Sequence, residues 1–366
     1  MIHQHEEIIL HLSLIDGIGP VAIQQLFDIS QNQQIALHDF YCMGISAFER
    51  YGLKSLVAQK IVEGLQSRQL LDQELALLNK HNLSFTTILS DDYPPLLKHI
   101  YMPPPILYYC GLPLDSYKKN LAIVGARRGN QYAQSVIDSF CPSLVAAGWT
   151  VVSGGALGVD SMAHRGVLAV QGATIAVLGS GLLKPYPYQN KRLFEQIEKH
   201  GTMVSPFPLL MEPSRGTFPA RNRIIAGLSQ ALLIVQAGER SGALITARYA
   251  LDQGKEIFVV PGSFNDPLSV GCHNLMREGA QLACSARDIM KAFGEMADIE
   301  KPKKGPIKIQ NSVQQAILDV CQVPASIDDM SAQLNFSSDE IYEQLFILQV
   351  EGVLEQNFLG LFQIKQ

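Results

Sequence analysis

The sequence predicts an α/β protein whose centre is an extended, Rossmann-like, doubly wound sheet. Strand and helix patterns alternate from residue 121 to 290, which is typical of a mostly parallel sheet with helices on both faces. Glycine-rich turns follow the β-branched runs at 149–152 and 174–178. Because ligands of open α/β sheets bind beyond the carboxyl ends of the strands, we expect a binding site at these turns.

The composition indicates an ordinary globular protein. Its 366 residues correspond to two or three domains, and 47% of them are hydrophobic. No apolar run approaches the ~18 residues of a membrane helix, and no basic segment precedes the first apolar residues. We therefore expect a cytoplasmic protein without membrane contact. The six cysteines lack C-x-x-C spacing, so we expect reduced thiols, no metal site and no cofactor.

Charge is distributed unevenly along the chain. Residues 1–106 carry 6 basic and 11 acidic side chains, residues 107–290 carry 17 and 12, and residues 291–366 carry 6 and 11. The net charges are therefore −5, +5 and −5. A polyanionic partner is expected to meet the basic centre.

Residues 1–95 are predicted to form a helical domain. The turn at 16–20 resembles those of helix-hairpin-helix or SAM-like modules, in which backbone amides can hold a DNA phosphate. No Lys or Arg occurs from Met1 to Glu49, and phosphate binding without cations loses most of its counterion-release drive. A structural or protein-contact role is favoured. Prolines at 91–95 and 102–105 indicate the boundary to a second domain, residues 96–295.

The second domain is predicted to alternate between strands and helices. The expected strands are 106–110, 121–124, 149–152, 174–178, 202–204, 231–235, 256–260 and 281–283. The expected helices are 131–147, 160–170, 193–199, 218–229, 243–252 and one that begins at 272.

The turn formed by Ser153, Gly154 and Gly155 is predicted to bind an anion. It follows a buried strand, and Asp160 is expected to cap the next helix, whose amide groups and dipole favour negative charge. A second turn at 179–181 would line the same crevice. Either turn alone is better explained by a tight strand-to-helix connection, and neither a dinucleotide fingerprint nor a P-loop is present.

Polar and cationic side chains follow several of the predicted strands. They are Arg127 after Gly125, Lys184 beside Tyr186, the run Arg221, Asn222 and Arg223, and the turn Ser241 and Gly242. A cation at the positive end of a helix is unfavourable unless an anion shares the site. We expect these side chains to share one rim and to hold the phosphates of a nucleic acid, with Tyr186 stacking on a base.

Residues 311–366 form a predicted third module after a polar linker, residues 296–310. Helical patterns at 312–321, 327–334 and 338–349 and a hairpin at 353–364 make a winged-helix pattern. No Lys or Arg occurs from residue 309 to 364. A DNA groove would repel such a module, so we expect it to contact protein.

Five motifs resemble those of the DprA/Smf family of DNA-processing proteins. They are SGGALGVDSMAH, TIAVLGSGLLKPYP, FPARNRIIAGLS, SGALITARYALDQG and VPGS, and the flanking modules are similar to those of longer members. The resemblance implies a non-enzymatic homodimer that binds and protects single-stranded DNA. It also implies loading of the RecA recombinase onto that DNA in natural transformation.

The family's motifs fall on several of the residues already named. Its G-x-R motif falls on Gly125 and Arg127, S-G-x-A-x-G-[IV]-D on residues 153–160, F-P-x-R-N-R on 218–223, and S-G-x-L-I-T-A on 241–247. The chain departs from the family at 205–208, at Gln236 where glutamate is usual, and at 271–274, where one residue is inserted.

Two enzymatic alternatives compete with DNA binding. A nucleotide-binding enzyme of the phosphoribohydrolase type needs a carboxylate over the sugar, and Glu239 is the nearest candidate acid. A hydrolase built on Ser153, Asp160 and His164 lacks the G-x-S-x-G motif, and His164 is more simply a residue on a helix face. A pure scaffold would leave the arginines unexplained.

Overall fold

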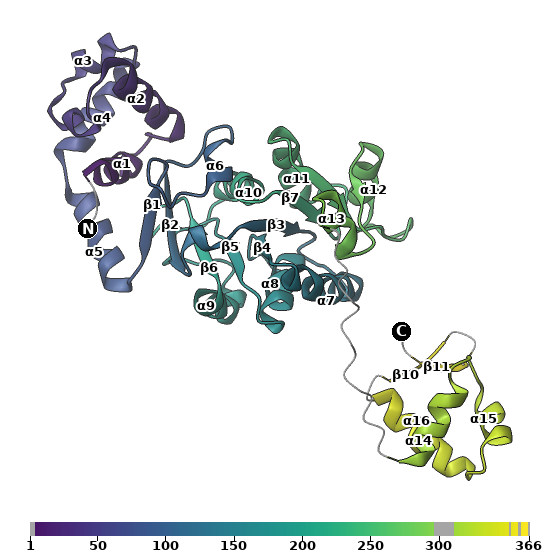
Figure 1. Ribbon diagram of the computed structural model, residues 1–366. Helices are drawn as coiled ribbons and strands as arrows, with labels where there is room; N and C mark the ends of the chain where they lie inside the picture. Colours follow the sequence, from purple (N-terminus) through teal and green to yellow (C-terminus); the bar gives the residue numbers. More distant parts are fainter. Residues whose placement is uncertain (1–3, 296–310, 351–352, 358–359, 365–366) are drawn as a thin grey trace. The chain divides into compact units, whose positions relative to one another are not determined.

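The computed structural model describes residues 4–295, 311–350, 353–357 and 360–364. Contacts divide the chain into two compact units, one up to residue 297 and the other from residue 298. The first unit contains the N-terminal helices and the large sheet (Figure 1).

The N-terminal segment is helical, as predicted. Its helices are α1 (Gln4–Leu14), α2 (Pro20–Gln33), the 3-10 helix η1 (Leu37–Cys42), α3 (Ile45–Arg50), α4 (Ser55–Gln66) and α5 (Gln69–His81). Their apolar faces enclose a core that includes Ile8, Ile23, Phe48 and Ile61. In the turn between α1 and α2, Lys60 Nζ donates a hydrogen bond to the carbonyl oxygen of Asp16 at 3.2 Å.

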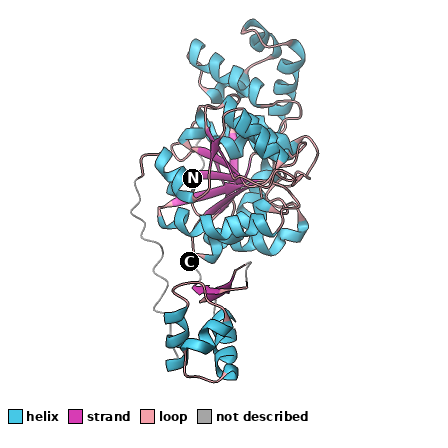
Figure 2. Ribbon diagram, turned by 90° about the vertical axis from the view of Figure 1, so that its right-hand side faces the viewer, coloured by secondary structure: helices cyan, strands magenta, loops and turns pink. Residues whose placement is uncertain are grey.

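A nine-stranded sheet forms the centre of the first unit (Figure 2). Its strands are β1 (Ser84–Thr87), β2 (Ile106–Gly111), β3 (Lys119–Val124), β4 (Trp149–Ser153), β5 (Thr174–Val177), β6 (Thr202–Ser205), β7 (Ala231–Ile234), β8 (Glu256–Val259) and β9 (Gln281–Leu282). The spatial order is β1-β2-β6-β5-β4-β3-β7-β8-β9. The seven strands from β6 to β9 in this order are parallel, while β1 and β2 are antiparallel to their neighbours.

Strand β1 was not expected from the sequence. It lies within the predicted helical domain, residues 1–95, yet it pairs with β2 through a register in which Ser84 opposes Tyr109. The sheet therefore begins before the proline-rich segment, and the domain boundary at residues 95 and 96 stays a prediction.

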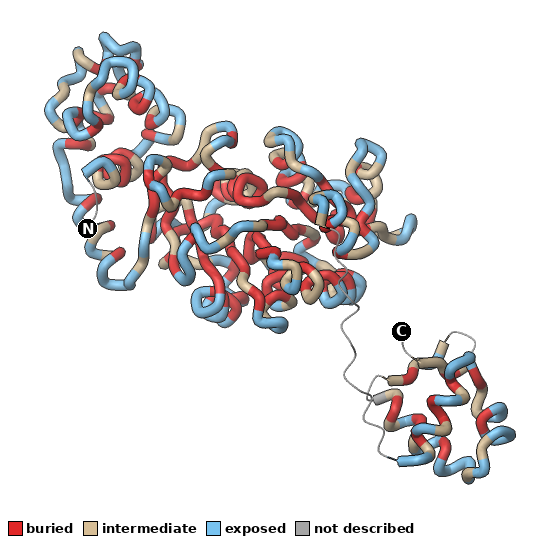
Figure 3. Tube along the Cα trace, viewed as in Figure 1, coloured by how far each residue is buried: buried red, intermediate tan, exposed pale blue. Residues whose placement is uncertain are grey.

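Helices cover both faces of the sheet. In Figure 1, α7 (Gln131–Ala146), α8 (Val159–Ala169) and α9 (Lys191–His200) lie over one face, and α10 (Thr217–Gly227) and α11 (Gly242–Asp252) lie over the other. Short elements complete the unit: α6 (Pro95–Lys98), η2 (Leu114–Ser116), η3 (Tyr188–Asn190), α12 (Val270–Arg277) and α13 (Ala286–Ala292). The strands between these layers are buried almost continuously, as parallel strands with two covered faces must be (Figure 3).

Two helix starts differ from the predicted ones in ways that matter for the site. Helix α10 begins at Thr217, so Arg221 and Arg223 lie in its interior and not at its positive end. Helix α8 is preceded by Gly158, whose φ of 79° suits glycine, and Asp160 is the second residue of the helix and not its cap.

The sheet changes its direction of winding between β3 and β7. From β3 the chain adds β4, β5 and β6 on one side, and then returns to add β7, β8 and β9 on the other. The loops after β3 and β7 therefore diverge, which opens a crevice at the carboxyl edge of the sheet.

The described residues of the second unit form three helices and an antiparallel strand pair, in the predicted order. They are α14 (Ser312–Val320), α15 (Ile327–Gln333), α16 (Ser338–Val350), β10 (Leu354–Gln356) and β11 (Phe362–Ile364). Ile317, Met330, Leu345 and Phe362 belong to a core of its own. The winged-helix assignment stays a prediction, and the predicted linker, residues 296–310, lies outside the described residues.

Candidate nucleic-acid interface

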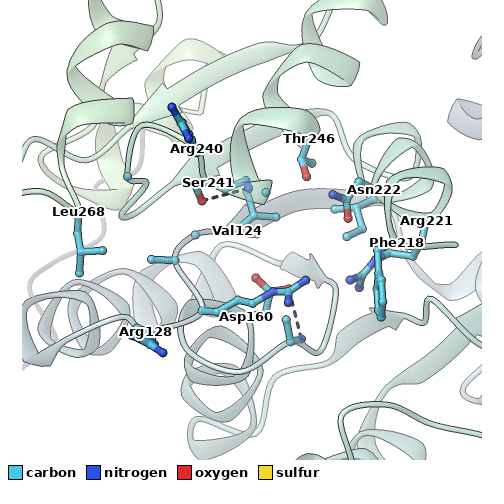
Figure 4. Close-up of a pocket in the computed structure, with 18 residues that line it drawn as sticks. Val124, Arg128, Asp160, Phe218, Arg221, Asn222, Arg240, Ser241, Thr246 and Leu268 are labelled. Atoms are coloured by element: carbon cyan, nitrogen blue, oxygen red, sulfur yellow. Dashed lines mark hydrogen bonds between the residues drawn. The ribbon is translucent and has the colours of Figure 1, made fainter. Parts of the chain in front are cut away.

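A crevice of about 480 Å³ lies where the loops after β3 and β7 diverge. Residues 124–128 form one wall, residues 240–243 form the opposite wall, and α10 closes one end. Figure 4 shows Phe218, Arg221 and Asn222 of α10 on one side of this pocket and Leu268 on the other. We call it the arginine crevice, because Arg127, Arg128, Arg221 and Arg240 line it.

A pair of amide side chains joins the loop after β3 to the loop after β7. The backbone N–H of Asn130 donates to Gln236 Oε1 at 3.2 Å, and Gln236 Nε2 donates to Asn130 Oδ1 at 3.0 Å. Asn130 Oδ1 also accepts from the N–H groups of Tyr132 and Ala133 and so caps α7. Gln236, a departure from the family pattern, thus ties the loop after β7 to the loop after β3.

The cations that reach solvent in the arginine crevice are Arg127, Arg128 and Arg240, all of which are exposed. The guanidinium of Arg127 lies 5.8 Å from the centre of the Phe218 ring, at a distance where a cation and a ring face attract each other. Sequence reasoning does not select Arg128 or Arg240. Arg128 directly follows Arg127, and Arg240 directly precedes Ser241. Adjacency to a predicted site residue is therefore the sequence signal that could have identified both arginines.

The N-terminus of α11 opens into the arginine crevice. Ser241 Oγ accepts a hydrogen bond from the N–H of Ala243, which caps the helix, and Gly242 is the exposed first residue. The partial positive charge of this helix end adds to that of the three exposed arginines. The predicted residues Ser241 and Gly242 therefore lie at the crevice together with Gly125, Arg127 and Asn222.

Arg221 supports the crevice from within the protein. It is 5% exposed, and its Nη1 donates to the carbonyl oxygens of Gly154 and Val177, at the ends of β4 and β5. Burial lowers the pKa of the guanidinium to about 10, although the nearby Asp160 acts in the opposite direction. Arg221 thus fixes two strand ends, and a Cβ at Gly154 would overlap its guanidinium.

The turn at 153–155 already contains an anion, which is a carboxylate of the protein. Asp160 Oδ2 accepts from the N–H groups of Gly154 at 3.1 Å and Ala156 at 3.4 Å. Burial raises the pKa of Asp160, while Arg221 and these N–H groups lower it. An external phosphate cannot use the same two amides while Asp160 holds them. Binding of a ligand anion by this turn stays a prediction.

The residues of the turn are themselves buried. Ser153 Oγ donates to the carbonyl oxygen of Ile123 at 2.6 Å, and Gly155 has a φ of 67° and packs against the Phe194 ring. A Cβ at Gly125 would lie 2.7 Å from the Val159 side chain, so this glycine allows β3 and α8 to approach closely. Ser153, Gly155 and Gly125 are therefore packing residues of the site.

The geometry of Ser153, Asp160 and His164 is not that of a hydrolase. His164 Nδ1 lies 2.8 Å from Thr174 Oγ1, and Thr174 Oγ1 donates to the Val151 carbonyl at 2.6 Å, so the histidine proton is on Nδ1. Burial lowers the pKa of His164 to about 3, which keeps the ring neutral. Each of the three side chains forms a structural hydrogen bond: Ser153 and His164 with neighbouring strands, and Asp160 with the turn after β4.

An aromatic group adjoins the arginine crevice. A hollow of about 50 Å³ shares Arg127, Phe218 and Arg221 with it and adds Tyr186. The ring centres of Tyr186 and Phe218 are 5.9 Å apart, as are those of Tyr186 and Tyr188, and both tyrosines are exposed. Tyr186 thus lies in one hollow with Arg127, whereas the sequence paired it with Lys184. Its stacking on a base stays a prediction.

The four cations expected on one rim do not all lie there. Lys184 Nζ forms an ion pair with Glu212 at 2.7 Å and does not line the arginine crevice. Arg223 lies in a separate cleft, where its Nη1 donates to the Tyr101 carbonyl at 3.3 Å. The prediction of a common rim is therefore wrong for these two residues. Lys184, in the loop after β5, is paired with Glu212. Arg223 is separated because neighbouring side chains of α10 point to different sides of the helix.

All six cysteines are free, with Cys42 and Cys284 exposed and the other four buried. No cluster of potential metal ligands occurs in the described part of the chain. Within that part, none of the helices combines the length and hydrophobicity of a membrane span.

Comparisons with known proteins show the family to which this chain belongs. A family model described as DNA recombination-mediator protein A matches residues 84–294. Protein Smf of Synechocystis sp. is 36% identical over 324 residues, which cover 85% of this chain and 78% of that protein.

Two solved structures are also similar. DNA processing protein A (DprA) from Streptococcus pneumoniae has a TM-score of 0.68 and 32% identity, and the match covers 79% of this chain and 98% of that one. DNA processing protein A from Helicobacter pylori, whose structure is described for its single-stranded DNA binding mode, has a TM-score of 0.53 and 29% identity, covering 58% and 96%. The chain therefore belongs to the DprA/Smf family of DNA-processing proteins.

Proposed function

We propose that the chain binds single-stranded DNA in the arginine crevice. The observation that carries the proposal is the meeting of three exposed arginines, the N-terminus of α11 and the ring of Phe218 at the switch point of the sheet. Arginines and a helix N-terminus suit phosphate groups. The Helicobacter pylori relative, described as binding single-stranded DNA, supports the same ligand for this chain.

A single strand fits this surface better than a duplex. Phe218, Tyr186 and Tyr188 form a row of neighbouring rings next to Arg127. Rings stack on unpaired bases while cations hold the backbone, which gives binding without strong sequence preference. Lys184 extends the basic surface, because its ion pair with the exposed Glu212 is weak and a phosphate can replace it.

We propose that this activity is binding and not catalysis. Of the described residues that line the crevice, Asp160 is the acidic one, and its carboxylate is buried and engaged with two backbone amides. Glu239, the candidate acid of a phosphoribohydrolase-type enzyme, is exposed and does not line the crevice. This arrangement lacks the poised carboxylate that attack at a sugar requires.

We further propose that the chain protects incoming DNA and passes it to the RecA recombinase during transformation, as a homodimer. The family's description as a recombination mediator supports this role. The second unit would contact protein: Asp339, Tyr342, Glu343 and Phe346 form one exposed stripe on α16, at helical spacing. Carboxylates in that position would be repelled by phosphates.

Fluorescence anisotropy with a labelled oligothymidine tests the proposal. Arg127→Ala should weaken binding about tenfold or more, since it removes a charge-assisted phosphate contact. Lys199→Ala is the control, because Lys199 lies in the last turn of α9, at the opposite edge of the sheet. Equal affinity of the Arg127→Ala variant and the unaltered chain would contradict the proposal, and release of free base from a nucleoside monophosphate would favour the enzyme.

A further inference from the structure

A second hollow lies on the other side of α10 and has no part in the proposed DNA site. Its volume is about 1110 Å³, more than twice that of the arginine crevice. The turn between α1 and α2, the proline-rich segment before β2, the loop after β6 and helices α10 and α11 enclose it. We call it the proline cleft, because Pro20, Pro104, Pro105, Pro206, Pro208 and Pro219 line it.

The walls of the proline cleft are apolar and aromatic. Phe207, Met211 and Tyr249 line it together with the prolines, and Tyr101 at the same site is 81% exposed. Small-molecule pockets commonly measure roughly 300–1,000 Å³, so this cleft is larger than such a ligand needs. Extended peptides bind to surfaces of this kind, where rings and pyrrolidines provide flat apolar contacts.

Arg223 provides the proline cleft with a cation that lacks a counter-ion. Its guanidinium is half-buried and has no carboxylate within ion-pair distance among the described residues. Burial lowers its pKa, in keeping with an unpaired charge. Its Nε is buried without a hydrogen-bond partner in the described part of the chain. A single anionic group placed here would relieve the cost of burying this charge.

Gln253 places an unused acceptor at the same end of the cleft. Its Nε2 donates to the backbone carbonyl of Arg223 at 3.1 Å, while its Oε1 is buried and lacks a partner among the described residues. An unpaired donor on Arg223 and an unpaired acceptor on Gln253 match the oxygen and N–H groups of a peptide.

The remaining charges of the cleft exclude a nucleic acid. Asp16 and Asp252 also line it, and both are exposed. Two carboxylates against one guanidinium repel a chain of phosphates, whereas they tolerate a ligand with one carboxylate. The charge pattern thus distinguishes the proline cleft from the arginine crevice.

We propose that the proline cleft binds the C-terminal segment of a partner protein, with apolar side chains against the prolines and the terminal carboxylate on Arg223. The proposal is independent of DNA binding, since it uses a different face of α10. Capture of a C-terminal carboxylate is an established mode of peptide recognition. In this cleft a guanidinium would hold the carboxylate, and the apolar walls would contact the preceding side chains.

Selection from a display library of short random peptides with free carboxyl ends tests the proposal on the full chain. We expect enrichment of apolar C-terminal sequences. Each selected peptide is then titrated by calorimetry with a free and with an amidated carboxyl end. Amidation should weaken binding about tenfold or more, because it removes the charge that Arg223 holds.

Three variants complete the experiment. Arg223→Gln should bind the free peptide as weakly as the unaltered chain binds the amide, and amidation should then have no further effect. Arg248→Gln, which changes an exposed arginine of α11 outside the cleft, should bind like the unaltered chain. Thermal unfolding verifies that each variant is folded, and Arg223→Lys, which keeps the charge, should restore part of the affinity. Absence of enriched sequences, equal binding of amide and acid, or unchanged binding to Arg223→Gln would each overturn the proposal.

Discussion

The arginine crevice and the proline cleft share α10 as a wall, and they differ in almost every property that decides what a hollow binds. The crevice has three exposed arginines, a helix N-terminus and a carboxylate that is already engaged. The cleft has one half-buried arginine, two exposed carboxylates and apolar walls. The first pattern suits a polyanion, and the second suits an apolar chain with one negative charge.

A sequence motif does not assign one role to all of its residues. Arg221 and Arg223 are two positions apart in the same F-P-x-R-N-R segment. Arg221 is buried and holds two strand ends, whereas Arg223 serves the proline cleft. Asn222, between them, lines the arginine crevice. The rotation of about 100° per residue along a helix sends three adjacent side chains to three environments.

The largest effect is expected for Arg221→Ala, which tests the difference between the two arginines of α10. The substitution leaves the carbonyl oxygens of Gly154 and Val177 without their donor and Asp160 without its neighbouring cation. We expect a loss of about 3 kcal/mol or more in the free energy of unfolding, measured by urea denaturation.

The matched variant is Arg127→Ala, in the same crevice. Arg127 is exposed, so its removal should change the free energy of unfolding by about 0.5 kcal/mol at most. Equal stability of the two variants would show that Arg221 is not a structural residue and would return it to the set of DNA ligands.

A smaller effect on the free energy of unfolding is expected from the protonation of His164, a buried residue of α8. Its pKa is about 3 in the folded chain because of burial, against about 6.5 when unfolded. Between these values the unfolded chain binds the proton and the folded chain does not, so stability is complete above pH 6.5 and is lost as the pH falls. The slope from this group is at most about 1.4 kcal/mol per pH unit.

His164→Leu should remove that contribution. Urea denaturation at several pH values between about 7 and 5 gives the free energy of unfolding of both proteins, and the unaltered chain should lose more stability on acidification than the variant. Other titrating groups are common to both and cancel in the difference. If the free energy of unfolding depended on pH in the same way in both proteins, His164 would be accessible to protons in the folded chain.

The sequence was sufficient to predict most of the fold. The alternation of apolar runs and helical patterns located the parallel strands within a residue or two, because buried strands of this kind are continuously apolar. Strand β1 was missed because its sequence, SFTT, is short and polar and becomes a strand only by pairing with β2. Pairing partners far apart in sequence leave no local pattern.

The site was predicted less completely than the fold. Arg127, Ser241 and Gly242 lie together as expected, because each follows a strand or opens a helix at the same edge of the sheet. Asn222 joins them from the interior of α10. The position of the crevice between β3 and β7 depends on strand order, which no local motif contains. The engagement of Asp160 with the turn at 153–155, and the separation of Arg223 from Arg221, depend on side-chain directions that appear only after folding.

The most direct test of DNA binding in the arginine crevice is the salt dependence of affinity for a single strand. The logarithm of the association constant is measured against the logarithm of salt concentration for the unaltered chain and for a variant with both Arg127→Ala and Arg240→Ala. Removing one arginine that neutralises a phosphate should reduce the slope by about 0.7, so the double variant should show a slope smaller by about 1.4. An unchanged slope would contradict the account, because it would mean that neither arginine meets a phosphate.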